Sequence, residues 1–470
     1  MHVSSLFGDY STGSFGEEAK YFVDFLAEAG FSYWQVLPFC MTDEYNSPYK
    51  SYSSFGANPY FIDLPTLYEA GLLTSEELAG QRQSTPYLSE NDRLTKERLD
   101  VLAKAASRVR DRSEIIKFIE KMPELAVAAK FLALREVNGG KSWQEWTTEE
   151  CDGERLFLWQ FIQYVFFRQW QTVKEYANGK GIEIIGDIPI YVAAESADVW
   201  AHREQFQLNA EGYPLRVAGV PPDYFSEDGQ LWGNPLYDWN KMREDGYSFW
   251  RERIRYMLTL FDGVRIDHFR GFEAYFSIPA DANSAKAGKW VKGPGRKIVD
   301  VIKEEAVGRL IIAEDLGDIT PGVKSLLRYS GFPGMRVFQF GFLGDSETPH
   351  LPHNYAENTV AYTGTHDNNT LLGYVWEMSA ERRRQVFDYC GHSGESFEEG
   401  AAAIVRTVLS SHAGTVIFPI QDILGFGADT RMNTPGKATG NWQYRITKEQ
   451  LDGIDRARLK AINRLYGRCK

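Results

Sequence analysis

The chain has 470 residues, of which 43% are hydrophobic and 14% aromatic, with a formal net charge of −12. This length and apolar content predict one large domain with insertions, or two to three domains. The negative balance argues against nucleic acid or an anionic membrane as the main partner, because both bind clustered Lys and Arg. No apolar run reaches the roughly 18 residues of a membrane span, and the amino end lacks the pattern of a signal peptide, so we expect a cytoplasmic protein.

The amino-terminal half begins with a helix followed by a strand. Gly13–Gly30 has apolar residues on one helical face, and Ser32–Pro38 follows as a buried strand. Pro59–Leu64 is a second short strand candidate. Residues 66–177 show charged helical patterns and little strand signal, which predicts a helical insertion. Its expected helices are Ser89–Arg112, Ser113–Val137 and Phe157–Tyr176.

Strands recur after the insertion. Ile182–Ile190 is followed by Val192–Trp250, a long segment rich in Gly, Pro and aromatics without clear periodicity, which is typical of functional loops. Five further strands are expected at Phe261–Asp267, Leu310–Glu314, Met335–Phe342, Val360–Thr365 and Thr415–Ile420. Eight strands with helices between most of them predict an α/β fold, a (β/α)8 TIM barrel. It would comprise residues 1–65 and 178–470, interrupted by the insertion 66–177.

Three of the apolar runs end in a carboxylate: Asp267, Glu314 and Asp367. In a parallel barrel the carboxyl ends of the strands meet at one mouth, so the three acids should converge on one pocket. Two carboxylates are the minimum for glycosidic-bond chemistry, one as nucleophile and one as general acid/base. The pattern therefore predicts an enzyme that acts on sugars.

The neighbours of Asp267 favour a nucleophile. Arg265 is two positions earlier and shares its side of the strand, and a guanidinium favours the ionised form of a carboxyl group. A buried Arg–Asp pair that only holds the barrel together is an equally good explanation for these two residues alone. Glu314 at the edge of an apolar strand suits a general acid, but alternation does not decide whether it or Asp315 faces inward.

Asp367 could bind sugar hydroxyls and help distort the ring, although a helix-capping Asp explains it better when it is considered alone.

Aromatic residues gather in the polar loops near these acids, which favours a carbohydrate cleft over loop anchoring. They are Tyr45, Tyr49, Tyr52, Tyr224, Phe225, Trp232 and Tyr237.

Longer motifs make the chain resemble a known family. GVRIDHFRGF, IIAEDLG and YTGTHDNNT look like conserved regions of the α-amylase clan. With SYWQVLP, NSPYKSYSSFGANPYFIDL, GDIPIYVAAESADVW and VAGVPPDYFSEDGQLWGNPLY, they resemble the amylomaltases, the 4-α-glucanotransferases or disproportionating enzymes. The resemblance covers about residues 15–445. GDYSTGSFG fits the family's opening segment only loosely, and the polar Lys50–Ser54 is a second departure that would alter donor-side contacts.

The resemblance implies a retaining double displacement, in which α-1,4-glucan segments move from maltodextrin donors to the 4-hydroxyl of glucose or another glucan. Asp267 would be the nucleophile, Glu314 the acid/base and Asp367 the transition-state stabiliser. The implied substrates are maltose, maltodextrins and glucans derived from starch or glycogen. No cofactor, calcium site or other metal is implied.

The same resemblance assigns substrate-binding residues around the three acids. Arg265, His268, His366, Asp187 and Tyr49 would position the nucleophile and the neighbouring sugar.

A lid over residues 217–237 is also implied by the resemblance. Tyr224 and Phe225 would touch the glucan, with Gln230 and Trp232 near the acceptor. Two other functions stay open on the residues: a hydrolase of the same clan that uses the same acids with water, and a non-catalytic glucan-binding barrel. The lid favours transfer over hydrolysis, and the presence of all three acids argues against a binding protein.

Overall fold

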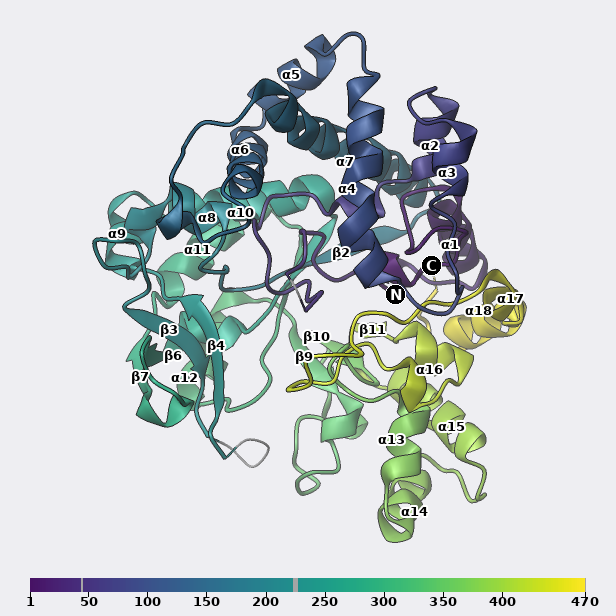
Figure 1. Cartoon of the computed structure of the whole chain (residues 1–470). Coiled ribbons are helices and arrows are strands. Elements are labelled where there is room, and N and C mark those ends of the chain that lie inside the picture. The colour runs from purple at the N-terminus through teal and green to yellow at the C-terminus, as the bar shows by residue number, and fades with distance from the viewer. Residues whose placement is uncertain (44, 223–226, 470) are drawn as a thin grey trace.

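The computed structural model describes residues 1–43, 45–222 and 227–469 (Figure 1). Its central sheet has seven parallel strands in the order β1-β2-β5-β8-β9-β10-β11 and curls into a nearly closed barrel. The strands are β1 (Tyr33–Gln35), β2 (Glu183–Ile188), β5 (Gly263–Ile266), β8 (Leu310–Ala313), β9 (Gly334–Val337), β10 (Thr359–Tyr362) and β11 (Thr415–Ile417). The predicted α/β barrel is confirmed, and each of these strands lies within or overlaps a segment expected from the sequence.

The eighth predicted strand, Pro59–Leu64, is wrong. Residues Pro59–Phe61 form a 3-10 turn, and helix α2 (Leu64–Glu69) begins directly afterwards. The side chain of Asn58 accepts from the Tyr60 N–H, and that of Asp63 accepts from the Thr66 N–H. Two helix-capping side chains, each followed by a proline in the first turn, therefore outweigh the short apolar run.

In the described part of the chain, six α-helices and the 3-10 turns Pro59–Phe61 and Trp143–Glu145 lie between β1 and β2. The helices are α2, α3 (Ser75–Ala79), α4 (Asn91–Ser107), α5 (Ser113–Glu120), α6 (Pro123–Val137) and α7 (Gly153–Gly179). The single helix expected at Ser113–Val137 is divided in two, because Pro123 lacks the N–H needed to continue α5 and starts α6 instead. The predicted insertion boundaries at 66 and 177 fall inside α2 and α7.

A second sheet stands beside the barrel. Its four antiparallel strands follow the order β4-β3-β6-β7, with β3 (Arg216–Val220), β4 (Gln230–Pro235), β6 (Ala274–Pro279) and β7 (Lys289–Lys292). The sequence did not predict this sheet. The segment interpreted as long loops at Val192–Trp250 contains β3 and β4, together with helix α8 (Ala197–Ala201), α9 (Trp239–Glu244) and the start of α10 (Ser248–Leu260). Gly219 and Pro235 interrupt the alternation of apolar and polar residues that would have indicated strands.

The other helices surround the barrel. They are α1 (Glu17–Glu28), α11 (Arg296–Ala306), α12 (Pro321–Ser330), α13 (Leu371–Glu377), α14 (Ala380–Tyr389), α15 (Phe397–Leu409), α16 (Ile420–Leu424), α17 (Lys448–Asp452) and α18 (Arg456–Leu465). Helix α1 confirms the amphipathic pattern at Gly13–Gly30. Figure 1 shows α2 to α7 gathered at one end of the molecule and α13 to α15 at the other.

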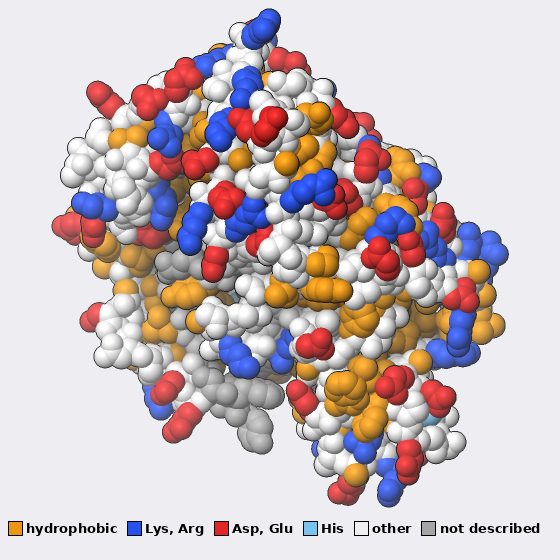
Figure 2. Space-filling model, turned by 45° about the vertical axis from the view of Figure 1, so that its right-hand side comes forward, with side chains coloured by type: hydrophobic (Ala, Val, Ile, Leu, Met, Phe, Trp, Pro, Cys, Tyr) orange, Lys and Arg blue, Asp and Glu red, His pale blue; other side chains and the backbone are white. Residues whose placement is uncertain are grey.

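The barrel interior is filled with side chains. Ile185, Ile312, Met335, Val337, Val360 and Tyr362 form its apolar cluster. A packed interior fixes the positions of the strand ends, where the candidate site lies. Acidic and basic side chains are interspersed over the face shown in Figure 2. None of the helices in the described part of the chain combines the length and apolar character needed to span a bilayer.

Candidate active site

Asp267 follows directly after strand β5 at the barrel mouth. Its backbone N–H donates to Ile188 O over 3.0 Å, which anchors it to the end of β2. Its side chain keeps 31% of its surface exposed, whereas Arg265 beside it is only 6% exposed. The Asp267 carboxylate is thus accessible to a ligand, whereas the Arg265 side chain is not.

Arg265 holds two carboxylates at once. Its Nη1 donates to both carboxylate oxygens of Asp187 over 2.8 and 2.7 Å, and its Nη2 donates to Asp267 Oδ1 over 2.8 Å. Because Asp187 and Arg265 are paired neighbours on β2 and β5, these contacts follow from the strand register. Burial raises the pKa of the Asp187 carboxyl, and the positive charge of Arg265 opposes that shift.

Glu314 accepts a hydrogen bond from the residue next to Asp267. The His268 N–H donates to Glu314 Oε2 over 2.7 Å, and the Phe269 N–H donates to the Glu314 carbonyl. His268 has a left-handed backbone, with φ of 53°, at the turn between β5 and the 3-10 helix Phe269–Phe272. Burial and then the negative charge of Asp267 raise the pKa of Glu314 to about 8. Glu314 therefore keeps its proton at neutral pH.

The structure resolves the ambiguity between Glu314 and Asp315. The Asp315 carboxylate accepts from the Met335 N–H over 2.6 Å and from Arg336 Nη1 over 2.9 Å, and it is buried. Asp315 thus ties β8 to β9, while Glu314 faces the same region as Asp267.

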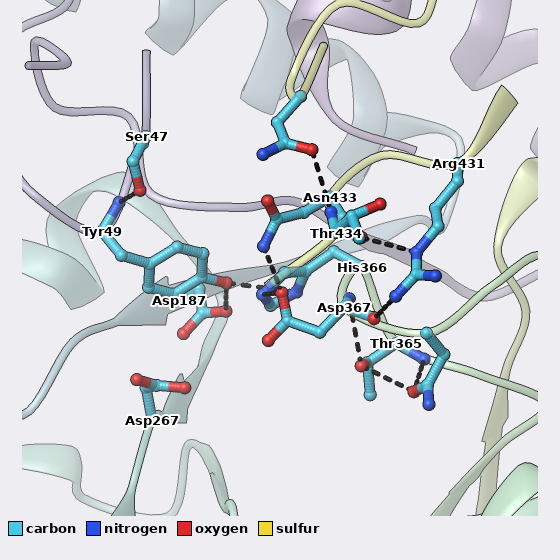
Figure 3. A network of polar contacts seen from close by, with 12 residues as sticks. Ser47, Tyr49, Asp187, Asp267, Thr365, His366, Asp367, Arg431, Asn433 and Thr434 are labelled. Atoms are coloured by element: carbon cyan, nitrogen blue, oxygen red, sulfur yellow. Dashed lines mark hydrogen bonds and ion pairs between the residues drawn. The ribbon is translucent and has the colours of Figure 1, made fainter. Parts of the chain in front are cut away.

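A stacked pair joins Tyr49 to His366. Their rings lie 4.8 Å apart and nearly parallel, and the Tyr49 hydroxyl donates to Asp187 Oδ2 over 2.8 Å and lies 3.3 Å from His366 Nδ1. Figure 3 shows the Tyr49 hydroxyl in contact with both Asp187 and His366, with Asp267 on the adjacent strand end. Loops that follow β1 and β10 therefore meet beside Asp187.

Asp367 is exposed and is held by residues that the sequence did not single out. Asn433 Nδ2 donates to Asp367 Oδ1 over 2.6 Å, and Arg431 Nη2 donates to its carbonyl over 2.5 Å. His366 Nε2 lies 3.4 Å from Asp367 Oδ1. Trp442, also missed, packs against the rings of Tyr49 and His366. These contacts come from a polar loop some 65 residues downstream, for which the sequence around Asp367 holds no signal.

The hairpin β3–β4 covers the other side of His268. The indole of Trp232 meets the His268 ring edge-on at 5.0 Å, and its Nε1 donates to Gln230 Oε1 over 3.0 Å. Burial lowers the pKa of His268 to about 4, so its ring is neutral at neutral pH.

Tyr224 and Phe225, the other two predicted lid residues, lie outside the described residues. Tyr45 is half-exposed on its loop, whereas Tyr237 is buried with its hydroxyl bonded to Ile190 O.

A parallel barrel with acidic residues after three of its strands is typical of an enzyme that acts on carbohydrates. A family model described as 4-alpha-glucanotransferase matches residues 1–451. The 4-alpha-glucanotransferase of Clostridium butyricum is 42% identical over 490 residues, covering 100% of both chains. That of Thermus thermophilus is 42% identical and covers 98% of this chain and 97% of its own. The chain therefore belongs to the 4-α-glucanotransferase family, and its activity is the transfer of glucan segments.

A solved structure agrees over the whole chain. Amylomaltase from Streptococcus agalactiae in complex with acarbose superposes with a TM-score of 0.95 at 37% identity, covering 100% of this chain and 99% of its own. Amylomaltase from Corynebacterium glutamicum, at 18% identity and a TM-score of 0.79, shares the fold. The resemblance inferred from the sequence motifs is confirmed.

Proposed function

We propose that the chain transfers α-1,4-glucan segments by a retaining double displacement at Asp267 and Glu314. The observation that carries this proposal is the hydrogen bond from the His268 N–H to Glu314 Oε2. It links Glu314, which keeps its proton, to the residue that follows Asp267, whose carboxylate is exposed. The two acids have different surroundings: Arg265 supplies positive charge to Asp267, whereas burial keeps the proton on Glu314. Such a division suits a nucleophile and a general acid.

In the first step, Asp267 would attack the anomeric carbon while Glu314 gives its proton to the departing glycosidic oxygen. The bond between that carbon and oxygen breaks, and a β-glucosyl ester forms on Asp267. The donor's reducing-end fragment leaves with the proton. In the second step, the ionised Glu314 takes the proton of an incoming 4-hydroxyl, whose oxygen displaces Asp267 and restores the α-linkage.

The surrounding residues would position the sugar and its charge. Asp367 is exposed and fixed by Asn433, so it can accept hydrogen bonds from ring hydroxyls without moving. His366 and Tyr49 form a flat aromatic and polar surface beside Asp187. We propose that Asp367 stabilises the oxocarbenium-like transition state, and that Tyr49, Asp187 and His366 bind the donor sugar.

The hairpin β3–β4 would exclude water while the ester waits for an acceptor. Trp232 packs on His268, whose N–H bonds Glu314, so the hairpin is in contact with the catalytic elements. We propose that Gln230 and Trp232 contact the acceptor sugar. The proposed donors are maltose, maltodextrins and segments of starch or glycogen, and the proposed acceptors are glucose and maltodextrins.

Incubation with maltotriose tests the reaction. Chromatography is expected to show free glucose and a ladder of longer maltodextrins, while the number of reducing ends stays constant. A rising number of reducing ends would instead identify hydrolysis as the main reaction.

Trapping tests the retaining mechanism separately. In Glu314→Gln, an α-maltosyl fluoride donor should still glycosylate Asp267, because fluoride leaves without a proton. The ester should then accumulate, because no base activates the acceptor. Mass spectrometry of the peptide containing Asp267 should detect the added maltosyl group. Its absence, with fluoride still released, would argue against a covalent intermediate.

We also propose that residues 66–177 form a mainly helical insertion subdomain within the barrel. Helices α2 to α7 fill this range, and α7 packs against α1, α10 and β2 on the barrel side. Hydrogen exchange that opens these helices together, at a free energy different from that of the barrel strands, would support this division.

A further inference from the structure

Trp376 is the most exposed tryptophan in the part of the chain that the structure describes. It is 53% exposed on helix α13, and the next, Trp290, is 37% exposed. The indole N–H of Trp376 donates no hydrogen bond to any described residue. A single exposed apolar side chain is ordinary in a protein, so the surroundings of the ring decide whether it can bind a ligand.

Gly427 lets a loop lie against the Trp376 ring. A Cβ on Gly427 would stand 3.1 Å from Cζ3 and 3.5 Å from Cη2 of the indole, so a larger residue there would push the ring away. Helix α13 packs against α16 and the 3-10 turn Ala428–Thr430, which bring this loop to it (Figure 1). The loop therefore supports the ring at one place, and about half of the side chain remains open to solvent.

Asp429 brings a carboxylate to the same place. Its Oδ1 would stand 3.1 Å from a Cβ on Gly427, as close as the indole, so the carboxylate and the ring are neighbours. Asp429 is exposed, and its side chain forms neither an ion pair nor a hydrogen bond with the residues described. An apolar ring thus lies beside a free donor, the indole N–H, and a free acceptor, the Asp429 carboxylate.

This combination of groups suits a sugar better than an apolar protein surface. The face of a glucose ring carries C–H groups that can pack on an aromatic ring, and its hydroxyls both donate and accept hydrogen bonds. Asp429 could accept from sugar hydroxyls, and the Trp376 N–H could donate to one. An apolar partner would instead take the charge of Asp429 out of water without pairing it, which is unfavourable.

The surroundings of Trp376 are continuous with the loop that carries Asp367. Helix α13 begins at Leu371, four residues after Asp367. Arg431, which follows the 3-10 turn Ala428–Thr430, donates from Nη2 to the Asp367 carbonyl over 2.5 Å. The two segments that bring Trp376 and Asp429 together therefore also contact the candidate active site.

We propose that Trp376, Gly427 and Asp429 form a platform that binds an α-1,4-glucan chain outside the reacting site. The inference rests on the proposed maltodextrin and starch substrates, and it adds a second contact for the long ones. A chain held at the platform keeps its other sugars close to Asp267 and Glu314. This raises their effective concentration at those acids, so long glucans are preferred over short ones.

Chain length separates the platform from the reacting site. Maltotriose has only three sugars, which the positions beside Asp267 and Glu314 would hold, whereas amylose is long enough to reach further. Trp376→Ala should raise KM for amylose about tenfold and leave kcat and the KM for maltotriose unchanged. Trp376→Phe keeps an aromatic face and should raise the KM for amylose about threefold or less.

Two kinetic results would overturn the proposal. One is an unchanged KM for amylose in Trp376→Ala. The other is an equal rise in KM for both substrates, because Trp376 would then act through the Asp367 loop. Tyr68→Ala is the matched control, since Tyr68 is 44% exposed on α2 at the opposite end of the molecule (Figure 1). It should change neither KM, and a rise for amylose equal to that of Trp376→Ala would also overturn the proposal.

Retention in native gels that contain amylose measures binding apart from turnover. In Asp267→Asn, adding Trp376→Ala or Asp429→Ala should lower retention at least threefold, and adding Tyr68→Ala should not. Equal retention in all these variants would overturn the platform. A parent that makes no longer maltodextrins from maltotriose, yet keeps retention dependent on Trp376, would refute the proposed reaction and support the platform. A parent dimer that Trp376→Ala dissociates would mean that a second copy covers Trp376, which would overturn the proposal.

Discussion

The backbone N–H of His268 donates to Glu314 Oε2 over 2.7 Å, so the residue after Asp267 carries the contact that orients the second acid. The position of Glu314 relative to Asp267 is therefore fixed by a contact between the ends of the adjacent strands β5 and β8. A backbone donor cannot be removed by a side-chain substitution, which makes this link resistant to mutation. It also means that a shift of β5 would move both acids together.

Replacement of Asp267 by Asn should abolish transfer while leaving glucan binding largely intact. The amide is nearly the same size and retains contact with Arg265, but it is a poor nucleophile. The expected loss in kcat is about 10⁴-fold or more. Steady-state kinetics with maltotriose and calorimetric titration with maltoheptaose would measure the two effects. Near-normal turnover would refute the nucleophile assignment.

The pH profile should report the proton on Glu314. Its pKa is raised to about 8, so it can donate a proton below that pH and loses this ability as the pH rises through 8. For maltotriose, kcat/KM should fall about tenfold per pH unit above about 8. With α-maltosyl fluoride, whose leaving group needs no proton, the fall should be much weaker. Identical alkaline limbs for both donors would contradict the acid role.

Arg265→Lys should lower both activity and stability. Lysine keeps the charge but cannot contact Asp187 and Asp267 in the same fork-like manner. We expect kcat to fall about 10- to 100-fold and the free energy of unfolding to fall by about 2 kcal/mol. Arg336→Lys is the matched control, because Arg336 forms its ion pair with the buried Asp315 rather than with Asp267 or Glu314. It should lose similar stability in urea unfolding and retain kcat. Parallel losses of kcat in both variants would point to a purely structural role for Arg265.

Tyr49→Phe should affect catalysis more than folding. It removes the hydroxyl that donates to Asp187 and meets His366 Nδ1, while the stacked ring remains. The expected effect is about a tenfold loss in kcat/KM, comparable to one hydrogen bond to a charged group. Tyr362→Phe serves as a control, because its hydroxyl bonds Gln35 inside the barrel. If both variants kept full activity, the donor-side role of Tyr49 would be excluded.

Asn433→Ala should weaken transfer by releasing Asp367. The amide donates to Asp367 Oδ1 over 2.6 Å (Figure 3), and the Asp367 side chain is 48% exposed. We expect kcat to fall about tenfold with little change in Tm, because the contact is near the surface. Lys437→Ala, on an exposed part of the same loop, should leave kcat unchanged. A wild-type kcat in Asn433→Ala would mean that Asp367 needs no such support.

The sequence predicted the elements whose signal is local. Buried strands that end in an acid, such as Leu310–Glu314, carry their pattern within a few residues, and the structure places them where expected. Pro59–Leu64 was misinterpreted because Asn58 and Asp63 cap helical turns, an effect of single hydrogen bonds that outweighs hydrophobicity.

Contacts between distant segments could not be predicted. The sheet β4-β3-β6-β7 pairs β3 with β6, about 60 residues later in the chain, and its glycines and prolines hide the alternation of polar and apolar residues. Asn433 and Trp442 reach the site only because the polar loop after β11 returns across the barrel mouth. Likewise, the orientations of Glu314 and Asp315 depend on which neighbouring strand supplies each with a hydrogen-bond partner. The residue pattern within β8 carries no information about those partners.

The contact between Asp367 and Asn433 also determines when activity can arise during synthesis. The polar network runs from Tyr49 to Asn433, so the chain must leave the ribosome through Asn433 before its last member is in place. Asp267 and Glu314 emerge much earlier and can already be close together. A nascent chain that ends before Asn433 would thus carry the two acids proposed to react, while Asp367 lacks its support. Full transfer activity would begin only after Asn433 has been added and has reached Asp367.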